Sequence, residues 1–144
     1  MKLEELHEMW TKDGEIDIIN VSSESSKTPK LHSKYYIVYV QEGLKLKRLR
    51  AEYKKLRLTK EQYYKGELDI EELKQYGWPA QPMKILRQDI PVYLDADDDI
   101  INMSLKIGMQ EAKVEYLESI IRQINNRGFQ IRAIVDWEKF RTGG

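Results

Sequence analysis

The residues best suited to chemistry are the basic side chains that follow Leu44, where eight lysines and arginines stand against one acid, Glu52. They are Lys45, Lys47, Arg48, Arg50, Lys54, Lys55, Arg57 and Lys60. The whole chain has no formal net charge, whereas residues 31–65 hold 10 basic and 3 acidic residues, a net charge of +7. A neutral chain that concentrates positive charge in one segment indicates a phosphate backbone as its partner.

The same segment has the spacing of a long helix with an apolar face and a basic face. Spacings of three and four residues, typical of a coiled-coil seam, relate Leu46, Leu49, Tyr53, Leu56, Lys60 and Tyr63. An equally spaced stripe on another face consists of Lys47, Arg50, Lys54 and Arg57, flanked by Arg48 and Lys55. Lys60 lies in the apolar register, and we expect its ammonium to reach water at the end of the helix.

Two tyrosines, Tyr63 and Tyr64, follow the basic stripe directly. Single-stranded nucleic acid is bound by cations that follow its phosphates and by aromatic rings that stack on its bases. We therefore predict that this helix binds a single strand, with Tyr64 as the stacking ring because it lies off the apolar register. Tyr53 and Tyr63 are predicted to pack in the core. The alternatives are a solvated coiled-coil face, an acidic protein partner in an adaptor, or a membrane surface.

Other patterns for catalysis or metal binding are weak. The chain has no cysteine, and His7 and His32 have no neighbouring partner residues. The acids at 95–99 do not make a calcium loop, because the sixth and twelfth positions counted from Asp95 hold Ile100 and Lys106. They fit the start of a helix better. No phosphate-binding loop or hydrolase motif is present, so we expect no cofactor, no metal and no enzymatic activity; a small nuclease that uses these acids is the remaining catalytic alternative.

The elements that must position these residues are helices, so the predicted fold class is mainly α. We expect a short helix over 1–12, a long helix from Pro29 to about Tyr64, and further helices over 69–76, 97–125 and 129–140. Glycines 14, 66 and 77 are predicted to end helices, and Gly128 to form a glycine C-cap. Residues 83–94, around Pro91, are predicted to form a small extended hairpin. The long helix is expected to pack as a helical hairpin or coiled coil.

The helix over 97–125 has a wider apolar face than one neighbour requires. One stripe consists of Met103, Ile107, Val114, Leu117, Ile121 and Ile124, and a second, beginning at Ile101 and Leu105, runs beside it. We therefore predict that the first stripe joins subunits in a bundle or ring.

The length fits a single domain, 1–144. We divide it into an N-terminal helical DNA-binding part (1–66), a connector (67–96) and a C-terminal oligomerisation part (97–144). Neither a signal peptide nor an apolar run of about 20 residues is present. We expect a soluble protein inside the cell that does not engage a membrane.

Short motifs in matching order give the chain a resemblance to a known family. They are the opening Met1-Lys2-Leu3-Glu4-Glu5-Leu6, then His32-Ser33-Lys34-Tyr35, Tyr63-Tyr64-Lys65-Gly66 and Arg127-Gly128-Phe129-Gln130-Ile131-Arg132. The last is close to that family's C-terminal run, Arg-Gly-Phe-Ala-Ile-Lys, and is followed in this chain by Ile134, Asp136 and Phe140. In these motifs the chain resembles, over nearly its full length, the UvsY family of recombination mediators from T-even and related phages.

The resemblance implies a small helical homo-oligomer, a hexamer or heptamer held together through its C-terminal region, in the cytoplasm of the infected bacterium. It implies binding to single-stranded DNA, to a RecA-like phage recombinase and to the phage single-stranded-DNA-binding protein. The implied activity is loading of recombinase onto covered DNA during recombination, replication and repair, without catalysis. The chain departs from the family at a Lys-x-Arg associated with DNA binding, where it has Leu58-Thr59-Lys60.

Overall fold

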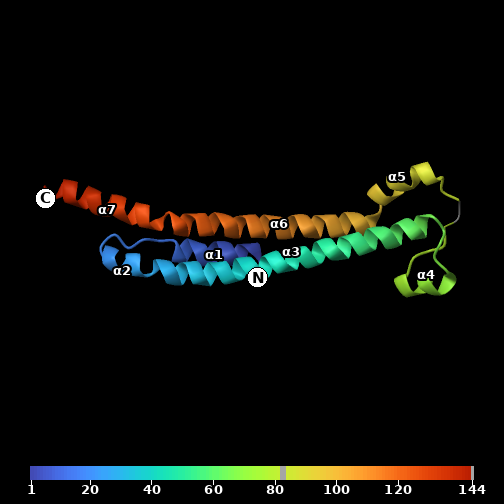
Figure 1. Cartoon of the computed structure of the whole chain (residues 1–144), viewed down its shortest axis with the longest axis horizontal. Helices are drawn as coiled ribbons and strands as arrows, with labels where there is room; N and C mark the ends of the chain where they lie inside the picture. The colour runs from blue at the N-terminus through green and yellow to red at the C-terminus, as the bar shows by residue number, and fades with distance from the viewer. Residues whose placement is uncertain (82–83, 144) are drawn as a thin grey trace. The chain divides into compact units, whose positions relative to one another are not determined.

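The computed structural model describes residues 1–81 and 84–143, and all regular structure in this part of the chain is helical (Figure 1). The α-helices are α1 (Leu3–Asp13), α2 (Val21–Ser26), α3 (Thr28–Tyr64), α4 (Ile70–Tyr76), α5 (Ile90–Asp95), α6 (Asp98–Asn125) and α7 (Arg127–Arg141), with a 3₁₀ turn η1 (Arg87–Asp89) before α5. The predicted mainly α class is confirmed. With 37 residues, α3 is about 55 Å long.

The chain forms two compact units, and the division falls within α3 and within α6. Residues 1–44 and 111–144 make the first unit, and residues 45–110 make the second. In each unit a segment of α3 packs against a segment of α6, as the predicted helical hairpin requires. The functional division into parts 1–66, 67–96 and 97–144 stays a prediction.

The core of the first unit joins α1, α3 and α6. It consists of Leu6, Tyr35, Leu117, Ile120 and Ile124, which are almost fully buried. In Figure 1, α1 lies beside the first half of α3 and beside α6. Polar contacts hold the end of α1 to α3, because the Asp13 carboxylate accepts hydrogen bonds from Lys34 Nζ at 2.6 Å and from the Tyr35 hydroxyl at 2.8 Å.

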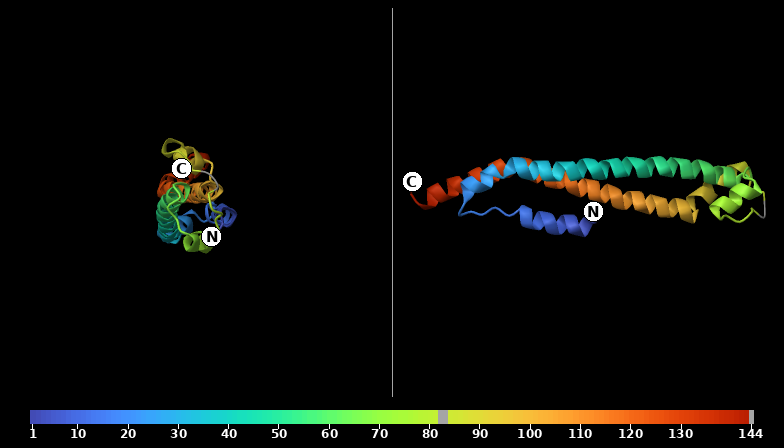
Figure 2. Two further views of the ribbon diagram at one scale, coloured as in Figure 1. Left: turned by 90° about the vertical axis from the view of Figure 1, so that its right-hand side faces the viewer. Right: turned by 90° about the horizontal axis from the view of Figure 1, so that it is seen from below.

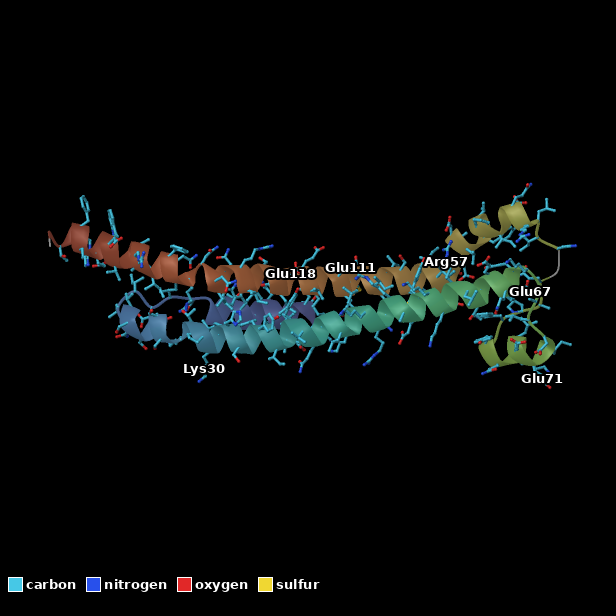
Figure 3. The ribbon with its side chains drawn as sticks, in the orientation of Figure 1. Lys30, Arg57, Glu67, Glu71, Glu111 and Glu118 are labelled. Carbon is cyan, nitrogen blue, oxygen red and sulfur yellow. The ribbon has the colours of Figure 1, made fainter. Side chains whose placement is uncertain are left out.

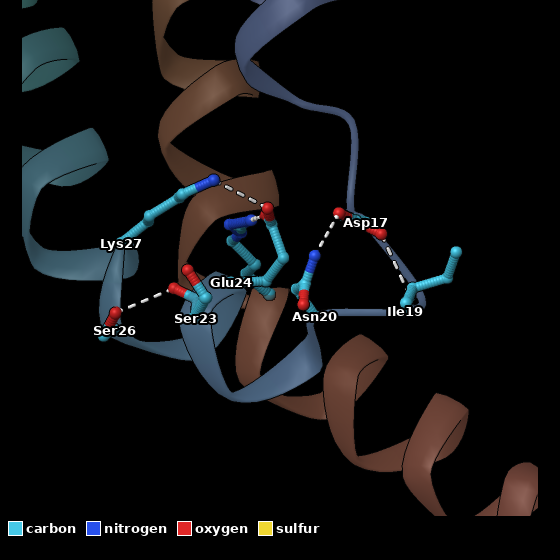
Figure 4. Close-up of polar contacts among 8 residues, drawn as sticks. Asp17, Ile19, Asn20, Ser23, Glu24, Ser26 and Lys27 are labelled. Carbon is cyan, nitrogen blue, oxygen red and sulfur yellow. Dashed lines mark hydrogen bonds and ion pairs between the residues drawn. The ribbon is translucent and has the colours of Figure 1, made fainter.

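A buried ion pair joins α2 to α7 in the same unit. The Arg127 guanidinium at the start of α7 donates to the Glu24 carboxylate, and both side chains are buried. Glu24 also accepts from Lys27 Nζ at 2.8 Å, as the close-up in Figure 4 shows. Figure 2 shows α7 continuing beyond α6 at the C-terminal end of the chain. The Ser-rich segment before the long helix, which has no clear sequence pattern, is therefore a helix with a structural role.

The second unit has a smaller core of Ile90, Leu94 and Ile100, against which Tyr53, Leu56, Tyr64 and Ile85 pack. Its helix α4 begins with a capping box, in which the Glu72 N–H donates to Asp69 Oδ1 at 2.8 Å. It ends at Gly77, whose φ of 73° is left-handed. The helix stops predicted at Gly66 and Gly77 are confirmed, since both have positive φ.

Two local predictions were wrong. The extended hairpin over 83–94 is replaced by η1 and α5 over residues 87–95; residue 83 lies outside the described residues. Ile90 and Leu94 are four residues apart, so a helix buries both on one face, and Pro91 is tolerated in its first turn. The C-cap predicted at Gly128 is also absent, because this residue lies inside α7 and has no positive φ. Here α7 begins at Arg127, whose ion pair with Glu24 anchors its first turn.

Candidate nucleic-acid interface

The eight basic residues predicted to bind DNA all lie on α3 between residues 45 and 60, within the unit of residues 45–110. Lys47, Arg50 and Lys54 are exposed, and Arg57, labelled in Figure 3, is half-buried at the end of the stripe. The neighbouring Lys45, Arg48 and Lys55 are also exposed. Burial separates these bases from the packing side of the helix, on which Leu46, Tyr53 and Leu56 are buried or half-buried. We call Lys47, Arg50, Lys54 and Arg57 the basic stripe.

Lys60 does not reach water, so the expectation for its ammonium was wrong. Its side chain is only 5% exposed, and Nζ lies 3.0 Å from Asp97 Oδ2 and 2.8 Å from Asp99 Oδ2. The ammonium also lies 3.9 Å from the centre of the Trp78 ring. Lys60 stays in the apolar register because two carboxylates at the start of α6 compensate its charge. That charge is therefore not available to a phosphate.

Asp97 is the central acceptor of this cluster. Its Oδ2 accepts from the Tyr64 hydroxyl at 2.6 Å, and its Oδ1 accepts from the Ile100 N–H at 3.0 Å, which caps α6. Burial acts to raise the pKa of Asp97, but the hydrogen bonds from Tyr64, Ile100 and Lys60 outweigh it and hold the pKa below its ordinary value. Asp97 is thus ionised at neutral pH. Asp97 caps α6, so the predicted place of these acids at a helix start is confirmed, whereas the ion pairs of Asp97 and Asp99 with Lys60 were not predicted.

Tyr64 is half-buried and cannot act as a freely exposed stacking ring, contrary to the prediction. It packs on the core of Ile90, Leu94 and Ile100, and burial together with its bond to Asp97 raises the pKa of its hydroxyl above the usual range. Tyr63 is buried as predicted, and its hydroxyl donates to the Pro79 carbonyl at 2.5 Å. The exposed aromatic residues among the described residues of the unit 45–110 are instead Tyr76 on α4 and Tyr93 on α5. The spacing of residues within α3 could not predict the exposure of these two tyrosines, because they lie on other helices.

Two of the six residues of the predicted oligomerisation stripe on α6 lie in the chain's own core. Leu117 and Ile124 are almost fully buried against α1 and α3, so they cannot join subunits, and that part of the prediction was wrong. Half-buried positions are Met103, Ile107, Val114 and Ile121. Three large aromatic side chains are exposed on α7, at Phe129, Trp137 and Phe140, and the last two rings stack 5.7 Å apart.

Within residues 1–81 and 84–143, no three histidine, aspartate or glutamate side chains are grouped as ligands for a metal ion. In the same residues, none of the helices combines the length and the apolar character that crossing a membrane requires.

Comparison with known proteins places this geometry in a family. The relative "Recombination protein uvsY" of Enterobacteria phage T4 is 25% identical over 143 residues, which cover 99% of each chain. Crystal structures of the bacteriophage T4 recombination mediator protein UvsY match the fold with TM-scores of 0.82 and 0.83. Both are 23% identical, and the matches cover 99% and 97% of this chain and 98% and 99% of the T4 chains.

The match to a family model extends over almost the whole chain and includes α3, α6 and α7. It covers residues 9–144, and the model describes the UvsY family as "Recombination, repair and ssDNA binding protein UvsY". The exposed bases on α3 agree with the last part of that description. The chain belongs to the UvsY family of recombination, repair and single-stranded-DNA-binding proteins.

Proposed function

We propose that this chain is a non-enzymatic mediator that binds single-stranded DNA along the basic stripe and loads a RecA-like phage recombinase onto DNA covered by single-stranded-DNA-binding protein. The observation that carries the proposal is the row of exposed bases on α3 in a chain of this family. Because Lys60 is compensated by Asp97 and Asp99, the stripe rather than the whole basic segment supplies the contacts.

The stripe suits a phosphate backbone. Consecutive members are three or four residues apart, a rise of about 5 Å along the helix axis, so a strand lying along α3 meets one cation per turn. Lys45, Arg48 and Lys55 add exposed charge on either side. Each neutralised phosphate contributes about −0.7 to the slope of log affinity against log salt. Four contacts therefore predict a slope of about −3 per subunit.

Self-association is proposed to occur through α7, as a hexamer or heptamer. The exposed rings Phe129, Trp137 and Phe140 are spaced so that they share one side of the helix. Exposed aromatic residues of this size are typical of contacts between subunits. The α7 rings are proposed in place of Leu117 and Ile124 of α6, because those two residues lie in the chain's own core.

Repetition of the stripe around an oligomer explains how mediation would work. Weak sites linked in one assembly raise the effective concentration of each for the same strand. A strand held by several subunits is bent or wrapped, which makes it a poorer substrate for a competing binding protein and a better one for recombinase. The energy for filament assembly would come from the recombinase.

The test is a titration of a fluorescent oligonucleotide at two salt concentrations, with mass measured by light scattering. Replacing the four residues of the basic stripe by alanine is expected to weaken binding severely and to leave the mass unchanged. A matched control removes four exposed bases from the other unit: Lys12, Lys30, Arg132 and Lys139. It has the same change in net charge and is expected to bind almost normally.

Equal loss of affinity in the two variants would mean that net charge alone, not the stripe, attracts DNA. Binding that does not change with salt would remove the electrostatic mechanism. The adaptor alternative predicts no DNA binding by the unmodified protein. Loading is tested separately, by the rate at which recombinase filaments form on covered DNA with and without this protein.

A further inference from the structure

Five aromatic rings of the second unit contact one another in a row. The Tyr76 and Trp78 rings are 4.6 Å apart and nearly parallel, at 18°, and Trp78 lies 5.2 Å from Tyr63. Tyr63 contacts Tyr64 at 5.1 Å, and Tyr64 contacts Tyr93 at 5.8 Å. The inner rings are buried or half-buried, whereas Tyr76 is 46% exposed. The stacked pair therefore ends in a ring that water covers.

Two backbone hydrogen bonds around Gly77 form the turn between Tyr76 and Trp78. The Gly77 N–H donates to the Lys74 carbonyl at 3.2 Å, and the Trp78 N–H donates to the Leu73 carbonyl at 3.0 Å. These are the two bonds of a Schellman motif, which requires the left-handed conformation that Gly77 has. The turn places Trp78 back against α4, next to Tyr76.

Contacts with α3 anchor the pair from the other side. The Lys60 ammonium lies 3.9 Å from the centre of the Trp78 ring, and the Tyr63 hydroxyl donates to the carbonyl of Pro79, the residue after Trp78. Lys60 follows Arg57, the last member of the basic stripe, by three residues, or about one turn of helix. The stack is thus fastened to the same helix, immediately beyond the end of the stripe.

An exposed ring at the end of a row of cations suits an unpaired base, because every base has a π-face that stacks on an aromatic ring. We propose that the Tyr76–Trp78 stack is a base-stacking site for single-stranded DNA whose phosphates the basic stripe holds. The inference rests on the proposed function and adds a contribution to the binding free energy that does not depend on charge. An exposed ammonium on the last turn of α4, that of Lys74, is available to the adjoining phosphate.

Acidic residues of α4 lie close to the stack. Glu71 and Glu72 are in the first turn of the helix, and Tyr76 is its last residue. Glu72 is also engaged, because its carboxylate accepts from the Asp69 N–H. In Figure 3, Glu67 and Glu71 mark the approach to α4 and its first turn. Glu72 is four residues before Tyr76 and shares its face of the helix, so its carboxylate repels a phosphate beside the stack, and the exposed ammonium of Lys74 opposes this repulsion.

The first arm of the test compares two oligonucleotides of equal length and charge, one with thymine bases and one with abasic sites throughout. Stacking predicts that the unmodified protein binds the thymine strand more tightly, with the same dependence on salt. Loss of one base–ring stack is worth about 5-fold in affinity at the low end of its measured range. A strand carrying the fluorescent base 2-aminopurine is expected to lose fluorescence on binding, because stacking on the tyrosine ring quenches it.

The second arm uses substitutions of the exposed ring. Tyr76→Ala is expected to lower affinity for the thymine strand about 5-fold and to leave affinity for the abasic strand unchanged. Tyr76→Phe keeps the ring and is expected to bind within about 2-fold of the unmodified protein. The matched control is Tyr36→Ala, which removes a tyrosine of almost equal exposure, 48%, from α3 in the other unit. Circular dichroism verifies that each variant is folded.

The outcomes separate this inference from the proposed function. Equal binding of thymine and abasic strands by the unmodified protein would overturn the stacking site and leave the basic stripe intact. Binding of neither strand would overturn the proposed function itself. If Tyr76→Ala bound DNA normally but no longer assisted the recombinase, the stack would be a protein-docking surface and the inference would be wrong.

Discussion

Replacement of Lys60 by methionine removes the ammonium that joins the end of α3 to the start of α6. Methionine keeps an unbranched, apolar stem of similar length, so the change tests charge more than packing. Lys60 and Asp97 each have side chains only 5% exposed, and their charged atoms are 3.0 Å apart. Removing one member of a buried ion pair leaves an uncompensated charge, which costs about 3–5 kcal/mol.

The structure places the expected cost at the low end of that range. Asp97 keeps its hydrogen bonds from Tyr64 and from the Ile100 N–H. Asp99 is about half exposed, so water solvates it when the ammonium is gone. We expect Lys60→Met to lower the free energy of unfolding by about 3 kcal/mol. For a chain of this size that is about 10 °C in the thermal midpoint.

Urea unfolding followed by circular dichroism at one fixed protein concentration measures this change. The control is Lys47→Met, on an exposed position of the same helix, with an expected effect below about 0.5 kcal/mol. The double variant Lys60→Met/Asp97→Asn is expected to lose less than the sum of the two single changes, because neither charge is left alone. If Lys60→Met were no worse than Lys47→Met, Lys60 would not be buried in an ion pair.

DNA binding by the same variant tests the exclusion of Lys60 from the interface. At a temperature where the variant is folded, its slope of log affinity against log salt should equal that of the unmodified protein. Lys54→Ala, which removes an exposed member of the stripe, should reduce the magnitude of the slope by about 0.7. A similar reduction for Lys60→Met would show that its ammonium contacts a phosphate.

Three further predictions concern stability. Burial acts to raise the pKa of Asp13, but hydrogen bonds from lysine and tyrosine side chains of α3 hold it below its ordinary value. The ionised carboxylate therefore stabilises the folded state above about pH 4, and this contribution is lost as pH falls below that value. Asp13→Asn should accordingly flatten the acid limb of a pH–stability curve. Gly77→Ala forces a left-handed φ on a residue with a Cβ and should cost about 1 kcal/mol, whereas Gly108→Ala, in mid-helix with open space around the new Cβ, should stabilise by about as much in the same urea titration. Arg127→Met should lower the free energy of unfolding by about 3 kcal/mol, because Glu24 stays buried with one cation fewer. Adding Glu24→Gln to that variant should recover part of the loss. An unchanged urea midpoint for Arg127→Met would contradict a structural role for the pair.

The helices could be predicted because their signals are local. The spacing of Leu46, Tyr53 and Leu56 sets the packing side of α3 and, with it, the side on which the bases are exposed. Gly77 ends α4 because its left-handed φ favours glycine, and Asp69 caps it because a short carboxylate reaches the N–H groups of the first turn. Each of these relations is completed within a few residues.

The failures arose where a residue's environment comes from distant parts of the chain. Lys60 is buried because Asp97 and Asp99, more than 30 residues away, compensate it. Leu117 lies in the core rather than between subunits because α1 covers it. The Tyr76–Trp78 stack depends on a turn at Gly77 and on contacts with Tyr63 and Lys60, which no period within one helix encodes.

The amino-acid sequence alone therefore determined the helical class, the basic stripe on α3 and the resemblance to the recombination mediators, because periodicity, charge and short motifs are properties of order along the chain. Tertiary structure decided which members of those patterns reach the surface. In the folded chain Lys60 is buried and Tyr64 is half-buried, whereas Tyr76 is exposed. The physical reason is that burial and charge compensation depend on neighbours in space, and those neighbours are set only when α4, α5 and α6 pack against α3.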